Sequence, residues 1–211
     1  MTDHRLLFMR ITFFCAYIFR YLFAFRGARS GQMLDVGAGF GHFCAVAKFF
    51  GHDCYAIEPR KECESYLAAR KVDNVYIGAV ESFQRGRYFD LASVITVLDE
   101  CVNKEQFLRS LGGLLNDKAV VYVEVRNLDF LLKINNGLAT DISYVGYLGL
   151  FEKTGFKVLK VTGWARPLTF GSCTVFLKTA ISNLFFFIPW QRKQMLGFKL
   201  EFSSATISDN I

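Results

Sequence analysis

Three glycines at alternate positions, directly after a short apolar stretch, constrain the fold of this chain more than any other feature. Residues 33–36 read Met-Leu-Asp-Val, and Gly37, Gly39 and Gly41 follow before a helical pattern begins. Such a turn needs glycine because its backbone adopts conformations closed to residues with a Cβ, and because a ligand must approach the main chain closely. The next apolar stretch ends on an acid, Glu58. This strand, turn, helix and strand predict a nucleoside-binding half-site.

The glycine spacing distinguishes two classes of cofactor. Dinucleotide-binding turns run G-x-G-x-x-G, with the third glycine inside the helix so that pyrophosphate lies at the helix N-terminus. Here the glycines run G-x-G-x-G, and Asp35 stands two positions before the first. This pattern resembles motif I, hydrophobic-D-x-G-x-G-x-G, of the class I S-adenosylmethionine-dependent methyltransferases. The resemblance implies an α/β, Rossmann-like fold: a seven-stranded mixed sheet with an antiparallel last strand and helices on both faces.

The resemblance also implies the cofactor contacts. In that family the glycine turn packs against the amino-acid tail and ribose of S-adenosylmethionine, and the acid ending the next strand accepts hydrogen bonds from both ribose hydroxyls. Glu58 has that position, whereas Ala79 replaces the acid that holds adenine in the family, so Glu81 or the backbone of Val80 is expected to hold it. The expected cofactor-binding residues are Asp35, Gly37, Ala38, Gly39, Gly41, Glu58, Pro59, Val80, Glu81, Thr96 and Val97.

Length and cysteine content bound the organisation of the chain. With 211 residues, 52% of them hydrophobic, it can bury one core but not two ordinary ones. We divide it into an N-terminal helix at 1–30 and a methyltransferase domain at 31–211, with a variable loop at 128–142 and an aromatic insertion at 163–195. The six cysteines form no C-x-x-C pair and no cluster with the three histidines. This predicts free thiols in a reducing cytoplasm and no metal site.

The segment 5–26 predicts a helix that is apolar on nearly all sides, interrupted by Arg10 and Arg20. Its longest uncharged run falls well short of the ~20 residues that cross a bilayer. Arg20 and Arg26 also disfavour a secretory signal. We favour a helix that packs on the sheet or covers the cofactor. The alternative is a helix that lies at an anionic membrane surface.

Phenylalanine is unusually frequent, with 23 residues concentrated in 8–50 and 170–202. A shared surface formed by residues 5–26 and 176–190 would give peripheral membrane contact, at the inner face of a membrane, and would suit a lipid-linked substrate. Packing of the two segments against each other is the alternative that we favour.

The remaining elements follow the family's alternation of strands and helices. Residues 89–97 are β-branched and apolar, as in a strand buried on both faces. Residues 197–207 alternate apolar and polar side chains, as in a partly covered antiparallel strand. Asn103 is expected to cap the helix 104–115, and Asn116 to Lys118 to turn into a strand over 119–125. Further helices are expected over 40–50, 60–70 and 143–153, and further strands over 53–58, over 75–77 and after Gly155.

The segment Leu98 to Asn103, L-D-E-C-V-N, resembles the family's strand-four exit V-L-E-H-V. Ligands bind at the carboxyl ends of parallel strands beside the strand-one loop, so Asp99 and Glu100 are expected to face the cleft as candidate catalytic bases. His42, at the start of a helix, ranks third.

Two residues are expected to contact the acceptor. Asn127 follows a strand-five ending similar to that of methyltransferases acting on sugars and quinone precursors, and Tyr144 opens the next helix.

These features predict a methyltransferase that acts on a small-molecule, glycan or lipid-linked acceptor at oxygen and releases S-adenosylhomocysteine. The alternative is a non-catalytic, methyltransferase-like partner subunit at a membrane, which the missing acid at Ala79 supports. The glycine spacing disfavours a nicotinamide-dependent reductase. A net charge of +6 is compatible with nucleic acid, but no N-P-P-Y-like motif is present, so nucleic acid is disfavoured as a partner. The sequence makes no prediction of oligomeric state.

Overall fold

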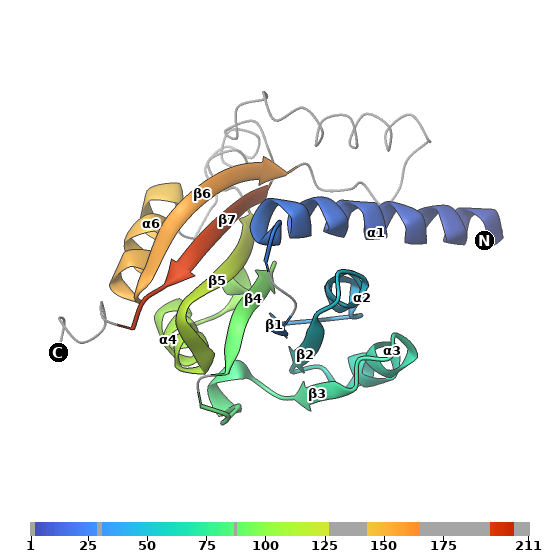
Figure 1. Cartoon of the computed structure of the whole chain (residues 1–211), viewed down its shortest axis with the longest axis horizontal. Helices are drawn as coiled ribbons and strands as arrows, with labels where there is room; N and C mark the ends of the chain where they lie inside the picture. Colours follow the sequence, from blue (N-terminus) through green and yellow to red (C-terminus); the bar gives the residue numbers. More distant parts are fainter. Residues whose placement is uncertain (1–2, 29–30, 87, 127–142, 165–194, 205–211) are drawn as a thin grey trace.

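The computed structural model describes residues 3–28, 31–86, 88–126, 143–164 and 195–204, with side chains from Phe14 onward. Seven strands form one sheet in the order β3-β2-β1-β4-β5-β7-β6 (Figure 1). The first five pair in parallel, and β7 lies antiparallel between β5 and β6. The predicted mixed sheet with an antiparallel last strand is therefore confirmed. The strands are β1 (Gln32–Val36), β2 (Asp53–Glu58), β3 (Asn74–Ile77), β4 (Phe89–Ile95), β5 (Leu115–Arg126), β6 (Phe156–Trp164) and β7 (Met195–Phe202).

Helices cover both faces of this sheet and divide its core into two layers. On one face lie α1 (Asp3–Phe25), α2 (His42–Phe49) and α3 (Glu64–Ala69), and on the other α4 (Lys104–Leu114) and α6 (Tyr144–Lys153). Because side chains alternate along a strand, Met33 of β1 packs toward α2 while Leu34 and Val36 pack into the layer that contains α4. Burial on both faces is what the apolar strands predict.

Short 3₁₀ turns follow three of the parallel strands: η1 (Lys61–Cys63), η2 (Val80–Ser82) and η3 (Leu98–Glu100). The helix expected over 60–70 therefore begins as η1 and becomes α-helical only at Glu64. The strand expected to run to residue 97 ends at Ile95, because Thr96 has a positive φ of 57° and leaves the extended conformation.

The turn expected at Asn116 to Lys118 is instead an irregularity within β5. Phe89 pairs with Leu115, and the next pair in the register joins Leu91 to Val120, so several residues of β5 lie opposite one of β4. Lys118 takes a positive φ of 64° inside this bulge. The bulge holds the extra residues without ending the strand.

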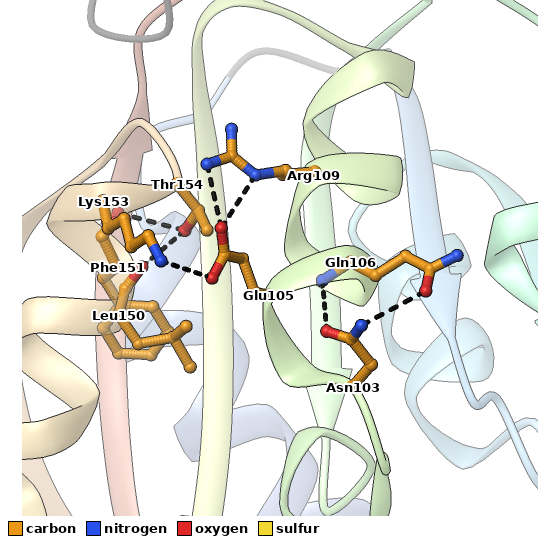
Figure 2. A network of polar contacts seen from close by, with 8 residues as sticks. All are labelled: Asn103, Glu105, Gln106, Arg109, Leu150, Phe151, Lys153 and Thr154. Atoms are coloured by element: carbon orange, nitrogen blue, oxygen red, sulfur yellow. Dashed lines mark hydrogen bonds and ion pairs between the residues drawn. The ribbon is translucent and has the colours of Figure 1, made fainter. Parts of the chain in front are cut away.

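A polar network joins α4 to the end of α6 (Figure 2). Asn103 accepts a hydrogen bond from the backbone N–H of Gln106 at 2.9 Å, which confirms the predicted N-cap. Glu105, two residues further, forms ion pairs with Arg109 and with Lys153 of α6, at 3.0 and 2.7 Å. These contacts fix the two helices against each other on the face opposite α1.

The C-terminal part of α1 is built into the protein. Ala24 and Phe25 are buried, and Tyr21 stacks on Phe50 with ring centroids 4.0 Å apart while its hydroxyl lies 2.6 Å from Nε2 of His52. Across the described residues, none of the helices combines the length and apolarity that crossing a bilayer requires.

Candidate active site

The glycine turn after β1 takes the left-handed conformation that its sequence predicts. Gly37, Gly39 and Gly41 have φ values of 72°, 53° and 73°. The requirement is strictest at Gly37, where an added Cβ would lie 2.1 Å from Cγ2 of Val97. The N–H of Gly37 also donates to the carbonyl oxygen of Ile57 at 2.7 Å, which ties the turn to β2. The turn is thus half-buried at the carboxyl edge of the sheet, and the side chain of Val97 packs against it where a Cβ on Gly37 would lie.

Glu58, the last residue of β2, turns its carboxylate toward this turn. Oε2 accepts a hydrogen bond from the N–H of Gly39 at 2.7 Å, and Oε1 accepts from the N–H and Nε of Arg60 at 3.0 and 2.9 Å. Burial would raise the pKa of Glu58, but these hydrogen bonds and the Arg60 charge outweigh it and lower the pKa. The carboxylate is therefore ionised and oriented at neutral pH.

A cavity of about 360 Å³ lies between the ends of β1, β2 and β4. Five of the expected cofactor residues and one expected base line it, together with two residues that the sequence did not single out, Arg60 and Ile95. The lining residues are Gly37, Glu58, Pro59, Arg60, Ile95, Thr96, Val97 and Glu100. For Arg60 a signal was available, since it stands two positions after the predicted ribose acid.

Thr96 is strained where it lines this cavity. A β-branched residue at positive φ is a genuine outlier, of the kind that costs about 1–3 kcal/mol. Its N–H donates to the carbonyl oxygen of Glu124 at 2.9 Å, and its hydroxyl to the carbonyl oxygen of Ile95 at 2.7 Å. These bonds hold the chain in a sharp exit from β4, which aims Val97 at the glycine turn.

Asp35 lies beneath the turn, outside the residues that line the cavity. Its carboxylate accepts hydrogen bonds from the hydroxyl of Ser93 at 2.7 Å and from Sγ of Cys44 at 3.4 Å. Burial raises the pKa of Asp35 to about 6, although both hydrogen bonds oppose the rise. In this position the side chain connects β1, β4 and α2 at the base of the site.

Two expected adenine contacts border a neighbouring hollow instead of this cavity. Val80 and Glu81 line a depression of about 600 Å³, together with Arg85. The charge of Glu81 nevertheless reaches the segment that follows β4. The pKa of Cys101 there is raised to about 11, mainly by burial and then by the charge of Glu81.

The two candidate bases lie in different environments. Glu100 is exposed and lines the cavity. Asp99, which was also expected to face the cleft, is buried and is not among the residues that line the cavity; its Oδ2 accepts from Nε of Arg126, at the end of β5, at 2.5 Å. The other oxygen, Oδ1, is buried and has no hydrogen-bond partner among the residues that the structure describes. An unpaired buried oxygen is costly, which makes Asp99 a candidate acceptor for a ligand proton.

His42 lies outside the cavity. Its ring stacks on Tyr17 of α1 with centroids 5.9 Å apart, and its Nδ1 lies 3.4 Å from Nη2 of Arg70. Burial and then the Arg70 charge lower the pKa of His42.

The expected acceptor contacts are only partly described. Tyr144, at the start of α6, stacks on Phe198 of β7 with centroids 6.0 Å apart. Asn127 lies outside the described residues, as do the loop at 128–142, the segment 176–190 that was considered for membrane contact, and nearly all of the insertion at 163–195.

One buried ion pair was not predicted from the sequence. Arg20 of α1 binds Glu124 of β5 through two hydrogen bonds, Nε to Oε2 at 2.6 Å and Nη2 to Oε1 at 2.9 Å. The hydroxyl of Tyr122 donates to the same Oε2 at 2.6 Å. Burial would lower the pKa of Arg20, but the Glu124 charge raises it overall. An arginine inside an apolar helix was the available signal, since a buried guanidinium needs an acid.

No group of histidine, cysteine, aspartate and glutamate within the described ranges could hold a metal ion. Every described cysteine is a free thiol.

Comparison with known proteins gives one family and many similar folds. A family model described as a methyltransferase domain matches residues 9–161. A possible histamine N-methyltransferase from Thermotoga maritima is 17% identical, with a TM-score of 0.63 over 90% of this chain and 91% of that one. S-adenosylmethionine-dependent methyltransferases from Archaeoglobus fulgidus and Clostridium acetobutylicum are 13% and 8% identical, with TM-scores of 0.62 and 0.63. The alignments cover 88% and 91% of this chain, and 91% and 92% of those chains. A search of curated protein sequences found no match.

Proposed function

The chain belongs to the class I S-adenosylmethionine-dependent methyltransferase family, and from this membership we propose that it methylates a hydroxyl oxygen of a small-molecule, glycan or lipid-linked acceptor. The observation that carries the cofactor-binding part of this proposal is the buried Glu58 carboxylate, which faces a cavity lined in part by Gly37. A carboxylate can accept hydrogen bonds from both hydroxyls of a ribose, and a glycine backbone admits the close approach of a ligand.

The residues around the cavity fit a nucleoside with a polar tail. Glu58 would accept from the ribose hydroxyls, while Gly37, Ala38, Gly39 and Gly41 would shape the turn beside the tail, and Thr96 and Val97 would close the opposite wall. Asp35 would support the turn from below through Ser93 and Cys44. When bound, the cofactor supplies a methyl group already activated on a sulfonium, so the protein has mainly to align the acceptor and exclude water.

Adenine would lie toward η2, where Val80 is buried and Glu81 is exposed. Because Ala79 offers no acid, the backbone of Val80 or the carboxylate of Glu81 would accept from the adenine amino group.

Transfer to a hydroxyl is assisted by a group that receives its proton. Asp99 is suited to this role, since Arg126 fixes one carboxylate oxygen and Oδ1 is left as an acceptor. Glu100 is the second candidate because it lines the cavity itself. Asn127 and Tyr144 would bind the acceptor on the β5 and α6 side.

The cofactor site is tested by titration calorimetry of S-adenosylmethionine and S-adenosylhomocysteine into the wild type, Glu58→Ala and the control Glu105→Ala. We expect both ligands to bind the wild type and the control, and Glu58→Ala to weaken binding by about tenfold or more, as for a lost pair of charge-assisted hydrogen bonds. Equal affinity in Glu58→Ala would refute the ribose assignment. Absence of binding at millimolar concentration would favour a non-catalytic partner subunit at a membrane.

We also propose peripheral contact with an anionic membrane, at its cytoplasmic face, through the surface formed by α1 and the end of α2. Phe49 is 68% exposed and touches Phe14 of α1, with centroids 5.9 Å apart. The neighbouring residue Lys48 is exposed; its Nζ donates to the backbone carbonyl oxygen of Lys71, which is also exposed, and lies 3.7 Å from Oδ2 of Asp73. Exposed rings flanked by lysines suit an anionic bilayer surface.

Deleting residues 1–26 would test this contact poorly, because it would leave Glu124 buried without Arg20. Co-sedimentation with anionic and neutral vesicles is cleaner with Phe49→Ser and the control Val145→Ser, which replaces an equally exposed apolar residue on α6. We expect Phe49→Ser alone to lower pelleting with anionic vesicles. Equal pelleting of the two variants would remove this surface from the proposal.

The division into an N-terminal helix at 1–30 and a domain at 31–211 is likewise a proposal. The family match begins at residue 9 and so includes most of α1. The contacts that α1 makes through Arg20 and Tyr21 indicate that this helix folds together with the methyltransferase domain.

A further inference from the structure

Arg60 forms an ion pair with Glu58, the acid to which we assign ribose binding. Its Nε donates to Oε1 of Glu58 at 2.9 Å, and an added Cβ on Gly39 would meet its Nη2 at 3.5 Å. The Arg60 side chain is 57% exposed, whereas that of Glu58 is 2% exposed. One partner is therefore fixed inside the wall of the cavity, and the other reaches it from solvent.

The hydrogen-bond capacity of Glu58 is nearly filled by these contacts. A carboxylate offers about four acceptor positions, about two on each oxygen. Oε1 accepts from the N–H and from Nε of Arg60, and Oε2 accepts from the N–H of Gly39. Oε2 therefore has room for one further donor, and Oε1 has none.

A ribose that donates one hydroxyl to each oxygen must displace a donor from Oε1. The N–H of Arg60 belongs to the backbone directly after Pro59 and cannot withdraw unless the main chain that follows β2 moves. The guanidinium stands on a flexible, largely exposed side chain and can withdraw at the cost of a partly solvated ion pair.

We propose that Arg60 is a built-in competitor of the cofactor ribose, which keeps the buried Glu58 carboxylate paired and oriented before binding and lowers cofactor affinity by the strength of that pair. This role presupposes the ribose assignment made above. Arg60 thereby sets the affinity for nucleoside cofactors and products whose ribose hydroxyls are free.

The test is calorimetric titration of S-adenosylhomocysteine into the wild type, Arg60→Met and Arg60→Gln, with Arg109→Met as a control that removes an exposed arginine paired to Glu105 on α4. We expect both Arg60 variants to bind about two- to fivefold more tightly than the wild type, the range for a partly exposed ion pair. The control should bind as the wild type does. Equal or weaker binding by the Arg60 variants would overturn the proposal, because Arg60 would then be neutral or a cofactor ligand.

Salt separates competition from a change in packing. Raising the ionic strength to about 1 M shortens the screening length to about 3 Å and weakens the partly exposed pair in the wild type. The affinity gap between the wild type and Arg60→Met should then narrow, while thermal melting without ligand should show intact folding of each variant. A gap that is constant across salt would contradict competition. Failure of the wild type itself to bind S-adenosylhomocysteine would overturn the proposed function, a result distinct from equal binding by wild type and variants.

Discussion

At the residue scale, glycines of similar backbone conformation differ sharply in the space that surrounds them. Gly37 and Gly51 both have positive φ, at 72° and 85°. An added Cβ on Gly37 would collide with Val97, whereas on Gly51 it would meet nothing within 4 Å. The two positions therefore separate backbone strain from steric exclusion.

Gly37→Ala should lower the free energy of unfolding by about 1–3 kcal/mol more than Gly51→Ala, because both add strain but only the first overpacks the site. Gly37→Ala should also abolish binding of S-adenosylhomocysteine, whereas Gly51→Ala should retain it. Urea denaturation and calorimetry of the two variants provide the comparison. Equal destabilisation would mean that Val97 moves aside freely and does not shape the cavity.

Asp35 gives the site a pH dependence with a defined sign. Its pKa is raised from 3.8 to about 6 by burial, so between these values the folded protein binds more protons than the unfolded chain. The contribution of this group to the free energy of unfolding is therefore fully present at low pH. It is lost as the pH rises through about 6, and the loss is at most about 3 kcal/mol.

Asp35→Asn removes this titration while keeping the shape of the side chain. The difference in free energy of unfolding between Asp35→Asn and the wild type should therefore shift in favour of the variant between about pH 4 and pH 7. Taking the difference in free energy of unfolding between the two proteins removes the contributions that other groups make in both. One of these is Glu58, whose pKa is lowered and whose contribution has the opposite sign. A difference that does not change with pH would show that folding does not raise the pKa of Asp35.

At the scale of elements, α1 is held to the sheet by a buried ion pair as well as by apolar contacts. Arg20 and Glu124 are separated by 104 positions, and both are almost fully buried. Replacing a buried pair with neutral groups is often tolerated, whereas removing one partner leaves a buried charge.

Arg20→Met should therefore lower the free energy of unfolding by about 3–5 kcal/mol, and the double variant Arg20→Met/Glu124→Gln should recover a large part of that loss. Chemical denaturation of both proteins and of Glu124→Gln completes the double-mutant cycle. If Arg20→Met cost less than about 1 kcal/mol, α1 would not depend on this pair.

The elements themselves were predictable wherever burial dominates the local pattern. The apolar run of β4 and the alternation of Phe198, Leu200 and Phe202 in β7 predicted strands, and Asn103 predicted a cap, because each pattern reflects a local environment. The bulge of β5 was not predictable from Asn116 to Lys118. Those residues favour a turn, and only their pairing opposite β4 keeps them in the strand.

At the scale of the whole molecule, the family resemblance of the glycine turn predicted a mixed sheet with an antiparallel last strand. It also predicted six of the residues that line the cavity. It did not predict Arg60 against Glu58, which depends on a side-chain rotamer, or Arg20 against Glu124, which joins distant parts of the chain. It also placed Asp35 in the site without distinguishing a ligand contact from a support beneath the turn. Sequence patterns report what each residue needs, whereas the partner that satisfies it is decided by the fold.

The central claim, that Glu58 binds the ribose of a methyl donor at the carboxyl edge of the sheet, is tested most directly by a crystal structure of the full chain with S-adenosylhomocysteine. We predict one ribose hydroxyl within about 2.5–3.0 Å of each Glu58 carboxylate oxygen, the range for such hydrogen bonds, with the ligand tail against Gly37 and Gly39. A ligand bound elsewhere, or bound here with its ribose out of reach of Glu58, would contradict the claim.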